Sequence, residues 1–463
     1  MIELSLHEIA EATGGRVAAA DVALSVQSVV TDSRDAGPGA LFVALRGEHA
    51  DGHDFLDDAF ERRATAALTE REHGHAGVVV VDDTWKALGH VGRLVRDRVD
   101  PLVVAITGSI GKTTTKDLTS AALGAGLLTE AAQGSFNNEL GVPLTLLRLS
   151  GDTQALVVEI GARGLGDIAT LTPLVQPDVA VVTAVVGAHL EQFHDLETVA
   201  QAKGELVDAL SARGTAILNA DDPRVAGMAS RTDARVLGYG YVGDSDLAAE
   251  VTAHDVTLDR LARASFRVAS PWGSTEVHLP LAGVHHVGNA LAALAAAGAL
   301  GVDLEAAAAA LAGARVSRWR SQVSEVDGVV VINDAYNASP TSLEAGLRTL
   351  VAIEHTGATW AVLGYMAELG ATEDEAHRRM GRRVAELGVD RLIVVGGARP
   401  LYEGAAAAGL VADHRWHVDD VQAALRVLRP RLEAGDVVLV KASRVAGLEQ
   451  VADGLGASGE ATT

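Results

Sequence analysis

A glycine-rich loop with one lysine and two threonines carries the clearest chemistry in this chain. It lies within residues 105–117, AITGSIGKTTTKD, after the apolar stretch PLVVAIT and before a sequence that can form a helix. Backbone N–H groups of such a loop, together with a helix N-terminus, bind phosphate, and Lys112 adds a positive charge. The hydroxyl of Thr113 can bind Mg²⁺. The pattern predicts a nucleotide phosphate site.

This loop is shorter than a strict P-loop. The strict motif has a glycine five residues before its Gly-Lys pair. Ile106 occupies that position here, and the glycine is Gly108 instead. The structural alternative is a glycine turn followed by a lysine at a helix N-terminus. The strand before the loop and the helix after it favour the phosphate site.

Three other polar side chains are candidates for metal or phosphate binding. Glu159 in ALVVEIGARG and His189 in VVTAVVGAHLEQFHD follow predicted strands, where the crevice of an open α/β sheet lies. A carboxylate there can complete a Mg²⁺ site. A solvated glutamate at the end of a strand is an equally good alternative. Histidine is an unusual Mg²⁺ ligand, so spacing alone favours a capping or surface role for His189. Lys203 lies in mid-helix, where a lysine is usually solvated.

Two more segments place polar residues at the ends of elements. Asn137 and Asn138 in SFNNELGVPLTLL precede a helix, and they can either cap it or contact a polar ligand. VVVINDAYNASP places three polar residues after a strand: Asp334, Tyr336 and Asn337. RVSRWRSQV places Arg318 and Arg320 at a junction between domains. An arginine entering a nucleotide crevice from a neighbouring domain can bridge phosphates, whereas the alternative is an ordinary surface arginine.

The elements that position these residues fall into three α/β domains. Residues 1–98 mix short strands and helices, with a helix predicted over FLDDAFERRATAAL (55–68) and a linker at RDRVDP (96–101). Residues 99–314 alternate Val/Ile-rich strands with helices, which predicts a parallel sheet buried on both faces. The glycine-rich loop makes this a P-loop-type domain. Residues 244–281 alternate apolar and polar positions instead, which predicts antiparallel hairpins. Residues 315–463 form a second, Rossmann-like doubly wound unit, whose tail, ASGEATT, we expect to be disordered.

Composition excludes several classes of protein. The chain has 463 residues, a formal net charge of −23 and no cysteine. The charge argues against a nucleic-acid-binding protein, and the lack of cysteine excludes disulfides and thiol catalysis. No apolar run is long and clean enough to span a bilayer, and the acidic N-terminus does not resemble a signal peptide. We expect a cytoplasmic protein and, by default, a monomer.

In order along nearly the whole chain, these stretches resemble the Mur ligase family, the ATP-dependent amide-forming ligases of peptidoglycan assembly. Glu159 and His189 match the family's Mg²⁺-binding pair, and Lys203 matches a lysine that the family carries carbamylated, near a second Mg²⁺. With Lys112, these residues would be catalytic. TGSIGKTT is similar to the family's phosphate loop, and the resemblance implies an ATP-binding set: Thr107, Gly108, Ser109, Gly111, Lys112, Thr113, Thr114, Asn289, Arg320, Asp334, Tyr336 and Asn337.

Within the family, three stretches resemble those of the member that adds a D-alanyl-D-alanine dipeptide. They are YNASP, the SFNNELGVPLTLL segment and LVKASR. The implied substrates are ATP, D-Ala-D-Ala and UDP-N-acetylmuramoyl-tripeptide, whose carboxylate would be activated as an acyl phosphate. TDSRDAGPGALFVALRG resembles the family's N-terminal domain, where the uridine end of the substrate would bind. The implied substrate contacts are Ser33, Arg34, Asn137, Asn138, Lys441, Ser443 and Arg444.

The chain also departs from the family pattern. His286 stands where the family often has Asn, and Tyr365 replaces an acidic residue, so neither contact is carried over. Two sister enzymes are alternatives: the ligase that adds the third amino acid and folylpolyglutamate synthase. YNASP argues against the first and the TDSR region against the second. A nucleotide-binding regulator that ligates nothing is the alternative from another class, although it would not need Glu159, His189 and Lys203.

Overall fold

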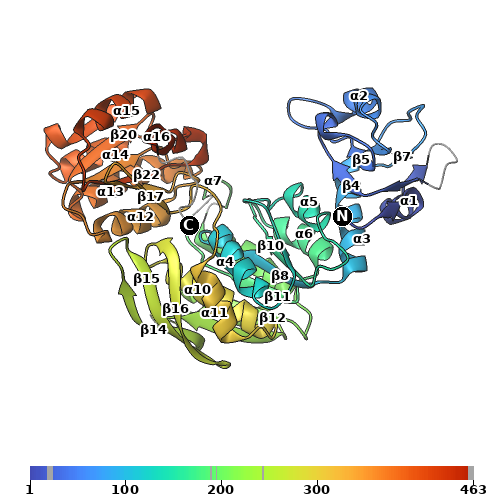
Figure 1. Ribbon diagram of the computed structural model, residues 1–463, viewed down its shortest axis with the longest axis horizontal. Helices are drawn as coiled ribbons and strands as arrows, with labels where there is room; N and C mark the ends of the chain where they lie inside the picture. Colours follow the sequence, from blue (N-terminus) through green and yellow to red (C-terminus); the bar gives the residue numbers. More distant parts are fainter. Residues whose placement is uncertain (18–23, 188–189, 194, 242–244, 457–463) are drawn as a thin grey trace.

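Three α/β units follow one another along the chain (Figure 1). The N-terminal unit, the central unit and the C-terminal unit each contain their own sheet, and the central unit lies between the other two. The predicted α/β fold with three units is therefore confirmed. The computed structural model describes residues 1–17, 24–187, 190–193, 195–241 and 245–456, so the tail ASGEATT lies outside the described residues.

The N-terminal unit contains a five-stranded sheet and three α-helices among its described residues. The strands run in the order β2 (Arg16–Val17), β7 (Val78–Val80), β6 (Ala66–Thr69), β5 (Ala40–Val43) and β4 (Ser28–Val30). The neighbours from β4 to β7 pair in parallel, and β2 pairs with β7 antiparallel. A small ribbon pairs β1 (Leu4–Ser5) with β3 (Ser25–Val26). The helices are α1 (Leu6–Thr13), α2 (Leu56–Glu61) and α3 (Thr84–Val99).

The helix predicted over residues 55–68 is wrong in its second half. Helix α2 ends at Glu61, Arg63 has a positive φ of 71°, and the chain then enters β6. All four residues of β6 are buried, and the strand pairs with β5 and β7. Pairing and burial thus override the helix propensity of alanine.

The linker predicted at residues 96–101 is also wrong, because α3 continues to Val99. Arg96 on this helix is buried, and its Nε donates to the carbonyl oxygen of Val175 at 3.1 Å. Leu88 and Val95 of α3 belong to one hydrophobic core that contains residues of both the N-terminal and the central sheet. Helix α3 therefore joins the two units as a packed element. The boundaries after residues 98 and 314 stay predictions.

The central unit is built on a nine-stranded sheet. Its order is β16 (Gly273–Ala282), β15 (Arg263–Ser270), β14 (Ala249–Leu258), β13 (Arg235–Gly240), β12 (Thr215–Asn219), β11 (Val179–Val182), β8 (Leu102–Thr107), β10 (Ala155–Glu159) and β9 (Thr129–Ala131). Strands β9 to β14 pair in parallel, and β14, β15 and β16 pair antiparallel. Both the predicted parallel sheet and the predicted hairpins are confirmed.

Helices cover both faces of this sheet, as its doubly apolar strands require. Val104 and Ile106 of β8 face one hydrophobic core, and Val103 and Ala105 face the other, because successive side chains of a strand point to opposite faces. One face carries α4 (Lys112–Gly124), α10 (His286–Ala299) and α11 (Leu304–Ala312). The other carries α3, α5 (Gly141–Leu146), α6 (Asp167–Val175), α8 (Leu196–Asp208) and α9 (Pro223–Ala226). The short α7 (Leu190–Phe193) precedes α8.

The C-terminal unit is a second doubly wound sheet. Its order is β17 (Gln322–Val326), β18 (Val329–Asn333), β22 (Val437–Lys441), β19 (Thr359–Leu363), β20 (Arg391–Val395) and β21 (Arg415–Val418), with β17 antiparallel. Helices α12 (Pro340–Ala352), α13 (Glu373–Glu386) and α14 (Arg399–Ala407) pack on one face, and α15 (Val421–Leu428) and α16 (Glu449–Gly454) on the other. Among the helices described, none has the length and apolar character needed to cross a membrane.

Candidate active site

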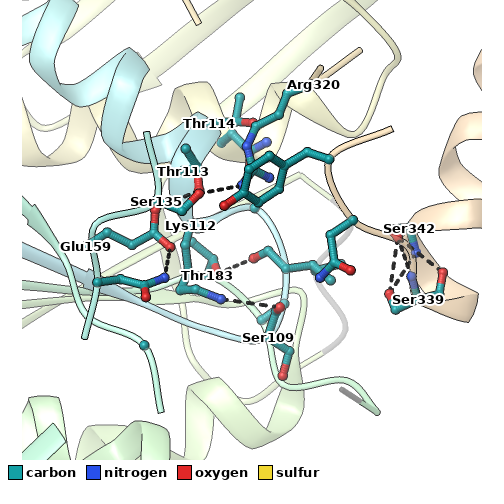
Figure 2. Close-up of a pocket in the computed structure, with 18 of the residues that line it drawn as sticks. Ser109, Lys112, Thr113, Thr114, Ser135, Glu159, Thr183, Arg320, Ser339 and Ser342 are labelled. Carbon is teal, nitrogen blue, oxygen red and sulfur yellow. Dashed lines mark hydrogen bonds between the residues drawn. The ribbon is translucent and has the colours of Figure 1, made fainter. Parts of the chain in front are cut away.

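The glycine-rich loop connects β8 to α4, as the sequence predicts. Gly108 has a φ of 143°, and a Cβ atom there would lie 2.0 Å from the Oγ1 of Thr183. Gly111 has a φ of 80°, and its Cβ would lie 2.7 Å from the Oδ1 of Asn289. Only glycine fits both positions. Thr183, at the end of β11, donates from its hydroxyl to the carbonyl oxygen of Ile110 at 2.6 Å and so fixes the loop (Figure 2).

Lys112, the first residue of α4, folds back over the loop. Its Nζ donates to the carbonyl oxygen of Gly108 at 2.7 Å. Burial lowers the pKa of Lys112, and the carboxylate of Glu159 opposes this shift. The ammonium group and the N-terminus of α4 thus point positive charge into the same space.

Oxygen atoms from three elements meet beside this loop (Figure 2). Glu159 ends β10 and is 1% exposed, and its Oε2 accepts from the hydroxyl of Thr113 at 2.6 Å. The Oγ1 of Thr113 lies 3.4 Å from the Oγ of Ser135. Hydroxyl and carboxylate oxygens are the ligands that Mg²⁺ prefers, so this donor set fits a magnesium ion.

The two asparagines of the SFNNELG segment have different roles in the structure. Asn137 donates from Nδ2 to the Oε1 of Glu159 at 2.7 Å, which fixes the carboxylate. Asn138 accepts at Oδ1 from the backbone N–H of Gly141 at 2.9 Å, at the start of α5. The sequence left capping and ligand contact open for both residues. In the structure Asn138 binds the first N–H of α5, whose N-cap residue is Leu140, and Asn137 contacts the carboxylate of Glu159.

Lys203 is buried, and the expectation of a solvated lysine from spacing alone is wrong. The residue is 2% exposed, its Nζ donates to the carbonyl oxygen of Ala162 at 3.3 Å, and it lies 5.6 Å from the ring centroid of Phe193. Burial, with a smaller contribution from the charge of Lys112, lowers the pKa of Lys203 to about 7. An amine with such a pKa is substantially neutral near pH 7, which is the form that reacts with CO₂.

Residues of the C-terminal unit face the loop from across a cavity. The Nζ of Lys441, at the end of β22, donates to the Oδ2 of Asp334 at 2.5 Å and to the carbonyl oxygen of Asn337 at 3.0 Å. The guanidinium of Arg320 lies 4.2 Å from the ring centroid of Tyr336 and donates to the Oγ of Ser135 at 3.0 Å. Arg320 thereby bridges the two units (Figure 2).

This cavity has a volume of about 1450 Å³ and brings together most of the predicted site. The predicted residues in its lining are Ser109, Gly111, Lys112, Thr113, Thr114, Asn137, Asn138, Glu159, Asn289, Arg320, Asp334, Tyr336, Asn337 and Lys441. Seven predicted residues are not in that lining: Thr107, Gly108, Lys203, Ser33, Arg34, Ser443 and Arg444. His189 lies outside the described residues.

The predicted substrate contacts outside the cavity have partners within their own units. Ser33 is buried, and Arg34 is exposed and donates to Asp32. Ser443 donates to the carbonyl oxygen of Ala338 at 3.3 Å. The guanidinium of Arg444 lies 4.3 Å from the ring centroid of Trp319. Arg318 is exposed, so only the second of the two junction arginines enters the cavity.

Sequence reasoning missed Thr183 and Ser135. Thr183 directly follows the buried Val run of β11, and a polar residue at that position was a usable signal. Ser135 immediately precedes Phe136 and the paired asparagines, but its partner Arg320 is 185 residues away. No local pattern indicates a contact over that separation.

Comparison with known proteins identifies the family. Three family models match in order: Mur ligase family, catalytic domain (25–90), Mur ligase middle domain (106–297) and Mur ligase, glutamate ligase domain (318–444). The chain belongs to the Mur ligase family. It is 43% identical to the UDP-N-acetylmuramoyl-tripeptide--D-alanyl-D-alanine ligase of Mycobacterium tuberculosis strain H37Rv, over 98% of each chain.

Solved structures of Mur ligases have the same architecture. A crystal structure of MurF from Acinetobacter baumannii matches with a TM-score of 0.89 and 31% identity, over 98% of this chain and 99% of that one. The MurF ligase of Thermotoga maritima in complex with ADP matches with a TM-score of 0.79 and 27% identity, over 92% and 96% of the two chains.

The two departures from the Mur ligase pattern are accommodated locally. Tyr365 donates its hydroxyl to the carboxylate of Glu373, which raises the pKa of Tyr365 to about 12, and its ring stacks on His377 at 5.3 Å. His286 is buried, and its Nδ1 accepts from the Nδ2 of Asn289 at 3.2 Å. Burial holds the pKa of His286 well below its ordinary value, so the imidazole is neutral and still orients Asn289.

Proposed function

We propose that this chain is the Mur ligase that joins D-alanyl-D-alanine to the terminal carboxyl group of UDP-N-acetylmuramoyl-tripeptide, with ATP as the energy source. The products are the UDP-linked pentapeptide, ADP and phosphate. The observation that carries the proposal is the shared cavity, in which the phosphate loop and Glu159 face Asp334, Asn337 and Lys441 of the next unit. Full-length similarity to enzymes named for this reaction supports the choice of substrates.

The reaction requires activation because a carboxylate is a poor electrophile. One oxygen of the substrate carboxylate attacks the γ-phosphorus of ATP. The bond between that phosphorus and the oxygen that bridges the β- and γ-phosphates breaks, and ADP leaves. The amine of D-Ala-D-Ala then attacks the acyl carbon, phosphate leaves, and the nitrogen loses a proton. Alignment of reactants can supply roughly 7–11 kcal/mol of such a barrier.

The phosphate loop holds the transferred group. The backbone N–H groups of Gly111 and Lys112 lie at the N-terminus of α4 and favour negative charge. Lys112 releases its contact with the carbonyl oxygen of Gly108 to bind the β- and γ-phosphates. Placed donors of this kind stabilise charge that develops in the transition state.

The residues present fit a Mg²⁺ ion. Thr113 and Glu159 would hold it through oxygen atoms, and the family resemblance adds His189. Lys203 in its carbamylated form would hold a second ion. Bound Mg²⁺ neutralises phosphate charge during phosphoryl transfer. Asn137 fixes the Oε1 of Glu159, so that Oε2 stays directed at Thr113.

The three units divide the substrates among them. We assign the uridine end to the N-terminal unit at Ser33 and Arg34, ATP to the central unit, and the dipeptide to the C-terminal unit near Lys441, Ser443 and Arg444. Movement of the C-terminal unit about the segment before Arg320 would close the cavity and exclude water, which otherwise hydrolyses the acyl phosphate. We propose that the enzyme acts as a monomer.

A ligation assay followed by mass spectrometry tests the proposal. Purified protein receives ATP, Mg²⁺ and UDP-N-acetylmuramoyl-tripeptide, with and without D-Ala-D-Ala. We expect the pentapeptide product and an equal amount of phosphate only in the complete mixture. Product from a diamino acid and the dipeptide precursor, or from glutamate and folate, would assign a sister reaction instead. Nucleotide binding without any product would favour a regulator.

A further inference from the structure

A cluster of metal-binding side chains lies in the N-terminal unit, on different elements from the cavity described above. Asp57 belongs to α2, and His73 and His75 belong to the connection between β6 and β7. One ligand atom of each residue lies within 4.8 Å of the others. Neither the proposed reaction nor the family comparison uses these residues.

The distances within this cluster fit a shared ion better than hydrogen bonds. The Oδ1 of Asp57 lies 3.3 Å from the Nε2 of His73 and 3.6 Å from the Nε2 of His75. Hydrogen bonds between such atoms are usually about 2.7–3.2 Å long. With metal–ligand bonds of about 2.0–2.1 Å, two ligands of one tetrahedral zinc ion lie roughly 3.3–3.4 Å apart. The separation of 3.3 Å matches that value, and the separation of 3.6 Å is slightly longer.

The orientation of the two imidazole rings also suits a common ion. Phe60 stacks on His75 with centroids 4.4 Å apart, and His73 and His75 are nearly parallel with centroids 5.1 Å apart. The ring centroids of Phe60 and His73 are only 6.1 Å apart. This distance would be much longer if the three rings formed one column with His75 in the middle. His73 therefore lies beside His75, and both rings turn a nitrogen toward Asp57.

His73 presents one ring nitrogen, Nε2, as a ligand. Its Nδ1 is buried and has no hydrogen-bond partner among the described residues, whereas its Nε2 faces Asp57. The side chains of Asp57 and His75 are 79% and 49% exposed, so an ion can enter from solvent and keep a water ligand. Two imidazoles and one carboxylate form a donor set typical of zinc and related divalent transition metals.

We propose that Asp57, His73 and His75 form a binding site for a divalent transition-metal ion, with Zn²⁺ as the probe. The bound ion cross-links the β6–β7 connection to α2. The next residue of that helix, Asp58, accepts a hydrogen bond from Ser33, so the ion would brace the segment to which we assign the uridine end. The site itself does not depend on that assignment.

Zinc titration of the full-length, untagged protein tests this site. After treatment with EDTA, ZnCl₂ is titrated in competition with a chromophoric chelator. The variants are His75→Gln and Asp57→Asn, and the matched control is His7→Gln, an exposed histidine on α1. We expect wild type and control to bind one equivalent more than either cluster variant. Equal binding by all four proteins would overturn the proposal.

Two further measurements separate this site from the active site and from unfolding. Glu159→Gln should keep the additional equivalent, because the cluster lies in another unit. Zn²⁺ should raise the melting temperature of wild type and of His7→Gln more than that of His75→Gln, since an ion bound only to the folded state stabilises it. With EDTA the melting temperatures should agree, which shows that the variants fold. The same zinc-induced shift in His75→Gln as in wild type contradicts the site.

Discussion

Thr113 and Glu159 are 46 residues apart in the sequence, yet the hydroxyl of one donates to the carboxylate of the other at 2.6 Å. The contact forms because β8 and β10 are parallel neighbours. Thr113 comes after β8 and Glu159 ends β10, so both residues lie at the same edge of the sheet. It couples the phosphate loop to an acidic side chain that is almost fully buried.

Replacing Glu159 by Gln should abolish most activity while the fold persists. The amide has nearly the same size and still accepts from Thr113, but it lacks the negative charge that a metal ion needs. Losing one preorganised electrostatic contact in an active site typically costs about 10²–10³-fold in rate. Phosphate release at several Mg²⁺ concentrations measures the effect, and thermal melting controls for folding. Wild-type activity at low Mg²⁺ would exclude the assigned role.

Arg320→Lys should weaken ATP use, whereas Arg318→Lys should not. Lysine keeps the charge but loses the planar stacking on Tyr336 and the geometry of the bond to Ser135. A stacking contact of this kind is worth about 0.5–2 kcal/mol, so we expect a rise of roughly 2- to 30-fold in the KM for ATP. Arg318 is the matched control because it is exposed and two residues away on the same segment. Equal effects of both variants would argue against a bridge at Arg320.

Lys116→Met should destabilise the protein and impair the site. The Nζ of Lys116 donates to the carbonyl oxygens of Ala132 and Gly134 at 2.6 and 3.1 Å and pairs with Asp117 at 2.7 Å. Asp117 in turn accepts from the backbone N–H of Ser317 at 2.7 Å. The pair thus holds both the segment before Ser135 and the segment before Arg320.

Breaking a buried ion pair by removing one partner typically costs about 3–5 kcal/mol. Chemical denaturation of Lys116→Met measures this loss, and Lys86→Met, an exposed lysine on α3, is the control. A loss no greater than that of the control would show that Lys116 contributes little to the network.

Local patterns predicted the parts of the site that depend on one strand or one loop. The phosphate loop can be predicted from a strand, two glycines and a helix, and Glu159 from its position at the end of a strand. The contact between Arg320 and Ser135 joins two units, and no periodicity encodes it. The conformation of residues 66–69 depends on pairing with β5 and β7, so alanine-rich sequence alone misassigned it.

The burial of Lys203 could have been predicted in part. It shares a helical stripe with Val199, Ala202 and Leu206, all buried, and this i, i+3, i+4, i+7 spacing marks the face that packs on the sheet. A lysine inside an apolar stripe is unusual and indicates a displaced pKa. What the stripe does not reveal is the nearby charge of Lys112, which comes from a different element.

Unmodified Lys203 should make stability depend on pH. Its pKa is lowered from 10.5 to about 7 in the folded state, so between pH 7 and 10.5 the unfolded state binds more protons. The free energy of unfolding therefore rises with pH in this window, by at most about 1.4 kcal/mol per pH unit. Denaturation of wild type and Lys203→Met in bicarbonate-free buffer measures it. From pH 7 to 10.5 the free energy of unfolding of wild type should rise relative to that of Lys203→Met. Parallel curves would contradict the lowered pKa.

Lys203→Ala should lower ligase activity, and bicarbonate should not restore it. A carbamate forms when a neutral amine adds to CO₂, so alanine has no nitrogen on which to build the added carboxylate. In wild type, activity lost after dialysis into CO₂-free buffer should return with bicarbonate. Lys86→Ala serves as the control because Lys86 is exposed and does not line the cavity. Full activity of Lys203→Ala would remove this residue from the mechanism, whereas an inactive variant with an unchanged melting temperature would support its role.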